Sequence, residues 1–359
     1  MTTDHPLLRL LRSPRQASKE LSAKEWTRAI RAARLGHLLG RLGHLMATHG
    51  VLTELPDPVR NHLVSANRVV DSQHRNVRWE ISEIHSTLSP LGIPFVLLKG
   101  GAYIATHCEA SCGRTLSDID IMVPHARIVE AERAFIDRGW FPGKLNAYDQ
   151  RYYRTWMHEL PPLRNLERGT TLDVHHTILP PTAALKPDVA QLWANTRPIA
   201  DLDGVFTLSP EDIVLHSATH LFHDGEMEHG LRDLVDMDCL ITEFSRQEDF
   251  WQRLTERAQQ LDLARPLYYA IECRRHFLGA LPPPTALQSL SSNGKYERDG
   301  TGFVLKCLTL AIGAILEETQ TRATTVGKFA VFVRSHYLRM PLYLLIPHLL
   351  RKMILPKQE

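Results

Sequence analysis

The segment at 117–121, Ser-Asp-Ile-Asp-Ile, constrains this chain more than any other feature. Alternate residues of a β-strand project from one face, so a strand here directs Asp118 and Asp120 toward one site while both isoleucines pack behind them. Carboxylates this close repel each other unless a cation lies between them. Mg²⁺ binds carboxylate oxygens together with substrate phosphates. The pattern therefore predicts a site for a metal and a phosphate-bearing ligand.

A second motif, Leu-Leu-Lys-Gly-Gly at 97–101, ends an apolar run that begins at Phe95 and predicts a strand over 95–98. Because glycine has no Cβ, Gly100 and Gly101 would let a phosphate approach the backbone closely. Lys99 would lie at the end of this strand, where its ammonium group would reach β- and γ-phosphates as a point charge. The alternative for Lys99 is an ordinary solvated lysine.

A further strand is expected over 170–178, and it supplies a candidate third carboxylate. Polar and apolar residues alternate along it, which puts Asp173 and His175 on one face. Asp173 is the first candidate, and Glu159 and Glu167 remain alternatives. His175 is interpreted as a base, as a residue that orients a metal-bound carboxylate, or as a strand histidine with no chemical role.

The order of these motifs resembles the DNA polymerase β-type nucleotidyltransferase superfamily. Between 95 and 140 the chain most resembles a bacterial family known as uncharacterised nucleotidyltransferases. There a Lys-Gly strand end is followed by a helix, an Arg (Arg114 here), the Asp-x-Asp strand and a helix that ends in Gly-aromatic. Sixteen residues separate Gly101 from Asp118, more than in many superfamily members. The likeness extends weakly to about residue 240, where Asp233 and Asp236 match a Leu-Arg-x-Leu-x-Asp helix.

The resemblance implies an enzyme that transfers a nucleoside monophosphate, with AMP expected, from an NTP to a hydroxyl or amine acceptor. It implies Mg²⁺, or alternatively Mn²⁺, to align the attacking oxygen and stabilise the leaving pyrophosphate. The catalytic and metal-binding carboxylates expected from it are Asp118, Asp120 and Asp173. The residues expected to bind the nucleotide are Lys99, Gly100, Gly101, Arg114 and Ser117.

Two of these nucleotide-binding residues have alternatives. Arg114 would either grip a phosphate through two N–H groups or form a surface salt bridge with Glu109 or Asp118. Ser117 would either cap a turn or donate to a phosphate. The sequence does not separate these readings.

Three histidines at helical spacing, His216, His220 and His223, form a second polar cluster. They fall near one helix face. They are interpreted as a polar face lining the acceptor or base pocket, as an interdomain packing face, or as a structural metal site.

The coarse organisation predicts an α+β fold, with a small mixed β-sheet nucleotidyltransferase core and flanking helices. We expect an N-terminal helical region over 1–88, the core over 89–180 and a C-terminal helical domain with an apolar tail over 181–359. The aromatic segment 152–158 is expected to favour a β-strand, and the segment 280–298 a loose loop.

The net charge of +2 argues neither for nor against nucleic acid. Without an aromatic-interleaved basic stretch, a small-molecule or protein acceptor is favoured, and a nucleic-acid acceptor stays open. Five cysteines, mostly within apolar runs, favour free thiols and a cytoplasmic protein. No zinc knuckle is expected at Cys108 and Cys112.

The tail at 329–355 is apolar but interrupted by basic residues and by Pro341 and Pro347, which are expected to break any continuous helix. It therefore predicts a buried tail or peripheral contact with a membrane surface, rather than a span. Two alternatives to catalysis follow. One is a non-catalytic nucleotide- or partner-binding module on the same fold, and the other is a membrane-surface adaptor.

Overall fold

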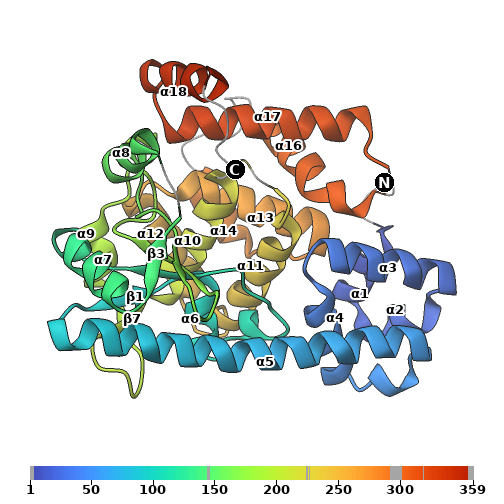
Figure 1. Ribbon diagram of the computed structural model, residues 1–359. Helices are drawn as coiled ribbons and strands as arrows, with labels where there is room; N and C mark the ends of the chain where they lie inside the picture. The colour runs from blue at the N-terminus through green and yellow to red at the C-terminus, as the bar shows by residue number, and fades with distance from the viewer. Residues whose placement is uncertain are drawn as a thin grey trace.

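The computed structural model describes residues 4–143, 146–223, 225, 227–291, 301–317 and 319–354. A sheet of seven strands lies on one side of the molecule and helices make up the rest (Figure 1). Its strand order is β3-β4-β5-β2-β1-β7-β6. The strands are β1 (Phe95–Leu97), β2 (Ile119–Met122), β3 (Trp140–Pro142), β4 (Leu163–Asn165), β5 (Thr171–His175), β6 (Arg197–Pro198) and β7 (Val205–Thr207).

The helices fall into three groups along the chain. Before the sheet lie α1 (Pro6–Arg12), α2 (Pro14–Glu20), α3 (Ala23–Leu35), α4 (Leu39–Thr48) and α5 (Asp57–Leu88). Between the strands lie α6 (Lys99–Ala105), α7 (Ile128–Asp137), α8 (Ala147–Trp156) and α9 (Val189–Ala194). After the sheet come α10 (Pro210–His223), α11 (Gly230–Phe244), α12 (Phe250–Gln260), α13 (Ala264–Leu278), α14 (Pro284–Ser291), α16 (Thr301–Gly313), α17 (Arg322–Arg339) and α18 (Leu342–Ile354). Short 3-10 turns are η2 (Leu52–Glu54), η3 (Ser89–Leu91), η4 (Glu109–Ser111), η5 (His125–Arg127) and η6 (Ala314–Leu316).

The sheet is mixed. β2 runs antiparallel to β1 and parallel to β5, and β7 runs parallel to β1. Parallel neighbours need a crossover connection, and the chain supplies it with helices that cover the sheet. β6 and β7 lie beyond residue 180, in the segment expected to be helical, and they belong to this same sheet. The mixed sheet with flanking helices confirms the predicted fold class.

Several predicted elements are wrong in type or in length. The aromatic segment 152–158 belongs mostly to helix α8, because Tyr148, Tyr152 and Trp156 recur every four residues and their rings contact one another on one helix face. The segment 280–298 contains helix α14, and its part from 292 lies outside the described residues. The strand predicted at 117–121 begins later, since β2 spans Ile119–Met122 and Asp118 precedes it.

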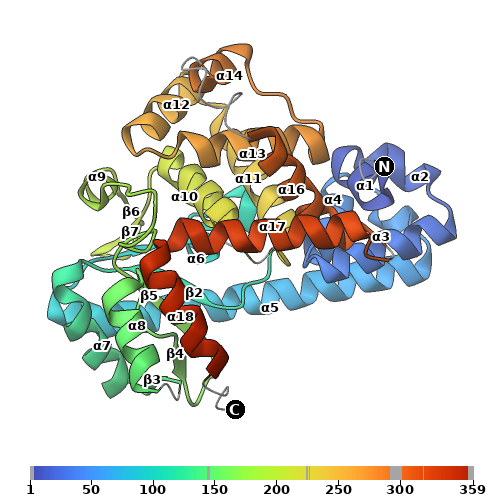
Figure 2. The ribbon, with the colours of Figure 1, turned by 90° about the horizontal axis from the view of Figure 1, so that it is seen from above.

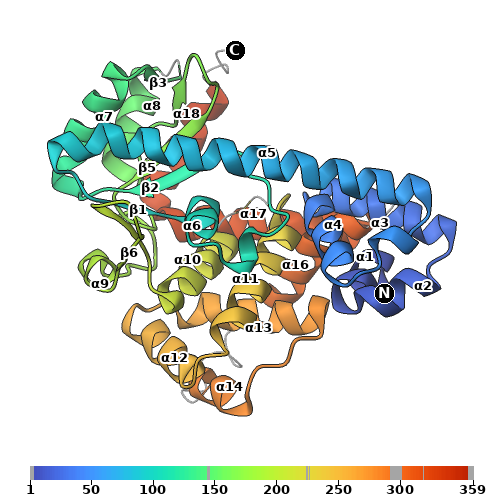
Figure 3. The same cartoon turned by 90° about the horizontal axis from the view of Figure 1, so that it is seen from below.

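Helix α5 crosses the whole molecule, from the N-terminal helices to the sheet (Figure 3). Its C-terminal half packs into the core around the sheet, while Val59 and Leu63 pack into a second core with the N-terminal helices and α16. Midway along α5, Gln73 bonds both the amide and the carbonyl of Leu116, at 2.8 and 2.6 Å. His74 Nε2 lies 2.8 Å from the carbonyl oxygen of Arg114. α5 therefore fixes the loop that leads into β2.

Helix α4 holds the same loop from another side. Gly40 of α4 and Gly113 of the loop touch backbone to backbone, so a Cβ on either residue would overlap the other. Gly113 also has a φ of +72°, a left-handed conformation that glycine adopts without strain. Both the close approach and the backbone angle therefore require glycine at 113.

The chain ends in two helices on the outside of the molecule. α17 crosses the body and α18 continues from its end beside α8 (Figure 2). Pro341 separates the two helices as expected, but Pro347 lies inside α18 without ending it. Among the described residues, no helix is long and apolar enough to cross a membrane.

Gly113→Ala is expected to destabilise the protein by about 3 kcal/mol, because left-handed strain of about 1 kcal/mol adds to a backbone clash that α4 can relieve only by moving. Gly50→Ala is the matched control, since Gly50 has a φ of +69° with open space around it. Urea unfolding of both variants checks this, and equal losses would contradict the role given to the α4 contact.

Candidate functional site

A cavity of about 460 Å³ opens where β2 and β5 meet α6, α8, α10, α11 and α17. All three predicted carboxylates line it, as do Lys99, Gly100, Arg114 and Ser117. Gly101 is not among the described residues that line it. A cavity of this size accommodates a small ligand. The structure thus brings together segments that are more than 200 residues apart in the chain.

Asp120 and Asp173 form the centre of the site. They are register partners in the parallel pair of β2 and β5, so their side chains leave adjacent strands side by side. Ile119, Ile121 and Leu172 are buried on the opposite face and hold both strands in the core. The local alternation of apolar and acidic residues therefore positions the two carboxylates.

Lys99 neutralises Asp120. Its ammonium nitrogen lies 2.7 Å from Asp120 Oδ1. Burial favours neutral forms of both groups, but their mutual attraction outweighs burial, which raises the pKa of Lys99 and holds the pKa of Asp120 well below its usual range. The expected strand position of Lys99 is wrong. It is the first residue of α6 and has a φ of +45°, a backbone turn that aims its side chain at Asp120.

A chain of polar groups extends from Asp120 to the cavity wall. His175 Nε2 lies 3.1 Å from Asp120 Oδ1, and His175 Nδ1 lies 3.4 Å from Glu159 Oε2. Burial opposes the charged form of His175, but the hydrogen bond to Asp120 and the charges of Glu159 and Asp120 outweigh it, so the pKa of His175 is raised. His158, next to Glu159, is buried near other cationic groups, and its pKa is lowered well below the usual range. His175 thus forms a hydrogen bond with Asp120 and lies within ion-pair distance of Glu159, and the lowered pKa of His158 favours its neutral form.

Asp173 lacks such a partner. Its Oδ1 is buried and accepts no hydrogen bond among the described residues. Burial, followed by the charges of Asp120 and Glu159, raises the pKa of Asp173 to about 7. A buried carboxylate oxygen without a donor is costly. Asp173 therefore has capacity for a proton or a cation.

Asp118 lies at the rim of the cavity, one residue before β2, where Ser117 Oγ donates to it at 3.0 Å. Among the described residues, Asp118, Asp120 and Asp173 do not bring one oxygen each within 4.8 Å of one another, a spacing that His158, Glu159 and His175 do meet. Lys99 instead supplies the positive charge at Asp120.

The other two candidates for the third carboxylate, Glu159 and Glu167, differ in their position relative to the cavity. Glu159 lines the cavity and forms an isolated β-bridge with His175. Glu167 lies exposed in the turn between β4 and β5 and does not line the cavity. Of the three acids, only Asp173 lies directly opposite Asp120.

Of the two alternatives for Arg114, the surface salt bridge to Glu109 or Asp118 is wrong. It is buried, and its Nε lies 2.6 Å from Asp236 Oδ2 on α11. Its guanidinium also lies over the ring of Tyr103, 5.6 Å from the centroid. Arg114 therefore faces the cavity from a position fixed by α11.

The two glycines of α6 differ. A Cβ on Gly100 would overlap the Arg114 guanidinium and the side chain of Leu116. A Cβ on Gly101 would only reach ordinary contact, 3.6 Å from Ile119 and 3.7 Å from Leu97. Close packing thus requires glycine at 100 and not at 101.

His216, His220 and His223 of α10 all line this cavity, opposite the carboxylates. His216 is buried near Lys99 and His220, and its pKa is lowered well below the usual range. Tyr103 of α6 and Ser217 of α10 share a hydrogen bond of 2.6 Å that holds the two helices together. The three histidines are not among the described groups whose ligand atoms converge for a metal.

The polar lining residues that the sequence pattern missed include Tyr153, His158, Glu228 and Arg339. Tyr153 and His158 lie in the segment taken for a strand. The pair His158-Glu159, polar and directly after an aromatic helix, was the available signal for a site. Arg339 is the last residue of α17 and lies more than 200 residues after the carboxylate strand in the sequence. No local sequence pattern indicates that it lines the cavity.

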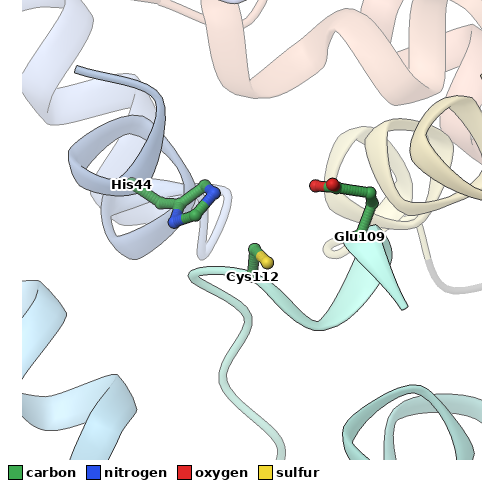
Figure 4. A group of neighbouring side chains, drawn as sticks. All are labelled: His44, Glu109 and Cys112. Carbon is green, nitrogen blue, oxygen red and sulfur yellow. The ribbon is translucent and has the colours of Figure 1, made fainter. Parts of the chain in front are cut away.

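A second group of ligand-type side chains lies outside the cavity. His44, Glu109 and Cys112 come from α4 and the turn after α6, with one donor atom each within 4.8 Å (Figure 4). The guanidinium of Arg41 binds the carbonyls of Glu109 and Ala110 beside them. Cys108 does not join Cys112, because its thiol donates to the carbonyl of Tyr103.

Comparison with known proteins identifies one family. The family model described as uncharacterised nucleotidyltransferase matches residues 22–279, which include α3 to α5, the sheet and the helices α6, α8, α10 and α11 that line the cavity, but not α17. No curated protein and no solved structure matches the chain. The match confirms the resemblance found in the sequence motifs.

Gly100→Ala is expected to displace Arg114 and Leu116 and to destabilise the protein by about 2 kcal/mol, since the added methyl group has no space. Gly101→Ala is the matched control in the same helix, and it should be neutral or stabilising by up to about 1 kcal/mol. Urea denaturation of both variants measures the difference. Equal stability of the two would show that Arg114 is not packed against Gly100.

Asp173→Asn is expected to change how stability depends on pH. Because the folded pKa is raised to about 7 from a usual value of 3.8, the folded wild type binds more protons than the unfolded chain between these values, and its stability falls as pH rises through that window. The variant lacks this loss, so at pH 8 it should gain on the order of 2 kcal/mol over the wild type, relative to their difference at pH 4.

Urea unfolding in a chelating buffer across this pH range measures the effect, and Glu167→Gln, outside the cavity, is the control. If Asp173→Asn kept the wild-type pH dependence, the buried and unpartnered state of Asp173 would be wrong.

Proposed function

Since the chain belongs to the uncharacterised nucleotidyltransferase family, we propose that it is a Mg²⁺-dependent enzyme that transfers AMP from ATP to a hydroxyl or amine acceptor. The observation that carries this proposal is the side-by-side placement of Asp120 and Asp173 on β2 and β5, with Lys99 beside them, at the head of the cavity. A non-catalytic role would not require a buried carboxylate pair whose repulsion the fold must offset.

The side chains fit a divalent cation. Asp173 Oδ1 is buried without a donor, and Glu159 and Asp118 add negative charge to the same cavity. Hard carboxylate oxygens suit Mg²⁺ and Mn²⁺. Asp118, Asp120 and Asp173 would hold the metal after their oxygens move closer together than they lie here and Lys99 leaves Asp120, and the metal would polarise the transferred phosphate and offset the charge of the leaving pyrophosphate.

In the proposed reaction, a bond forms between the acceptor oxygen or nitrogen and the α-phosphorus, and the bond from that phosphorus to the bridging oxygen breaks. When the metal and the nucleotide bind, the metal would balance the charge of Asp120. The ammonium group of Lys99 would then be available to contact the β- and γ-phosphates. A carboxylate oxygen of Asp173, ionised once the metal is bound, would take the acceptor proton. Arg114 would present its remaining N–H groups to a phosphate.

The histidine face of α10 would contact the base or the acceptor. His216 is neutral, and a neutral imidazole both donates and accepts hydrogen bonds. With no basic stretch interleaved with aromatic residues, a small-molecule or protein acceptor is favoured over a nucleic acid.

Asp120→Asn is expected to lower nucleotide transfer by at least about 100-fold, since it removes the charge shared by Lys99, His175 and the metal. The assay incubates purified full-length protein with Mg²⁺ and each α-labelled NTP. Pyrophosphate release and label transfer to the protein itself or to components of a cell extract are followed. Glu167→Gln is the control, because this acid is exposed outside the cavity.

Transfer by the wild type and the control, lost in Asp120→Asn, establishes the activity and names the nucleotide. Absence of transfer, together with no Mg²⁺-dependent NTP binding by calorimetry, would overturn the proposal and favour a binding module on the same fold.

A further inference from the structure

The large apolar side chains of helix α17 point to solvent, whereas an amphipathic helix on a protein surface usually directs them toward the core. The residues that pack against the body are small or short, and they are Thr324, Gly327, Val331 and Ser335. The outward face carries Val326, Phe329, Phe332, Val333 and Tyr337, with Phe329 exposed to 67% and Tyr337 to 61%. These positions recur every three to four residues and form one stripe. The apolar stripe therefore faces away from the protein.

The fold holds this orientation firmly. A Cβ on Gly327 would lie 2.8 Å from Leu310 of α16, so the two helices meet too closely for a larger residue. Arg334 Nη1 donates to the carbonyl of Phe222 at 2.7 Å, and the guanidinium lies over the ring of Tyr269. The carbonyls of Leu338 and Arg339 accept bonds from Ala184 and Thr182. Turning the stripe inward would break all of these contacts.

Helix α18 repeats the pattern. Leu342, Tyr343, Ile346, Leu349 and Leu350 are exposed, with Tyr343 at 74%. Its buried side contacts α8, where His348 stacks on the ring of Tyr152. α17 and α18 form the upper face of the molecule in Figure 1 and lie nearest the viewer in Figure 2. Their exposed side chains make an apolar face larger than the scattered exposed residues of ordinary soluble proteins.

The charge of this segment has one sign. Between 322 and 354 the sequence has no Asp or Glu, and its six Arg and Lys residues are Arg322, Lys328, Arg334, Arg339, Arg351 and Lys352. Exposed apolar side chains with flanking cations are the features by which helices bind the interface of an anionic bilayer. Three of these cations are engaged within the protein, since Arg334 contacts Phe222 and Tyr269, Arg339 lines the cavity and Arg351 lies over the ring of Tyr148. Arg322 is exposed and Lys328 is half-buried on α17, and a second copy of the chain would bring like charges against them, at a Coulomb cost that anionic headgroups do not impose.

We propose that α17 and α18 bind the surface of a membrane that contains anionic phospholipids, with the residues of the stripe inserted among the headgroups. This inference does not rest on the proposed enzymatic function. Arg339, at the end of α17, lines the cavity. Helix α17 therefore contributes both to the proposed membrane face and to the wall of the cavity.

The test is cosedimentation of the full-length protein with sucrose-loaded vesicles, either of phosphatidylcholine alone or of phosphatidylcholine mixed with phosphatidylglycerol. Phe329→Ser/Val333→Ser removes two exposed apolar side chains from the stripe. Val69→Ser/Leu281→Ser is the matched control, because Val69 and Leu281 are comparably exposed on other surfaces. Thermal unfolding verifies that both variants fold.

The wild type and the control should bind the anionic vesicles, and the stripe variant should bind about tenfold more weakly. Binding should weaken on neutral vesicles and when salt is raised to about 0.5 M. Failure of the wild type to sediment with anionic vesicles, or equal binding by both variants, would overturn the proposal. So would a dimer, seen by light scattering, that the stripe variant dissociates while no vesicle binding occurs.

Discussion

The buried ion pair between Arg114 and Asp236 is the contact on which the site depends. Two charges taken out of water must find each other, because an unpaired partner in the interior costs several kcal/mol. Asp236 lies on α11, 122 residues after Arg114, so this requirement fixes the approach of α11 to the loop before β2. Gln73 and His74 of α5 bind the same loop. Together with the ion pair, these contacts fix the conformation of the long segment between Gly101 and Asp118. The carboxylate strand starts where this loop ends.

The cavity that results is electrostatically incomplete. One ammonium group, that of Lys99, lies among the carboxylates of Asp120, Asp173 and Glu159, and it makes its ion pair with Asp120. The protein offsets the remaining repulsion by protonation: Asp173 titrates at about 7, and His175 gains proton affinity between two acids. Either response is reversed when a cationic ligand enters, since the ligand then supplies the charge that the protons had supplied. For the proposed reaction, this charge balance would favour binding of a metal together with its anionic substrate over binding of either one alone.

The local parts of this site were predictable from the sequence, and the long-range parts were not. Alternation of acidic and apolar residues at 117–121 and 171–175 is a strand property, and the structure places these segments side by side. The direction of the Lys99 side chain depends on the left-handed backbone conformation of this residue. The residue type does not predict that conformation, because lysine rarely adopts it. The partner of Arg114 could not be found by spacing, because ion pairs across helices leave no periodic signal. The aromatic residues of the segment 152–158 favour a strand by residue type, whereas their four-residue recurrence places most of the segment in helix α8.

The C-terminal helices show why apolar content alone does not decide where a segment lies. The sequence allowed either a buried tail or contact with a membrane surface, and both follow from the same composition. What separates them is the position of the small residues: Gly327 and Ser335 allow α17 to approach the body closely, and this close approach leaves the large side chains no place but outside. The inner face of α17 is suited to close packing, and its outer face is apolar with flanking cations. The helix can therefore contact two different surfaces at the same time. One is the protein, and the other, in our proposal, is a membrane surface, apolar within and anionic at its headgroups.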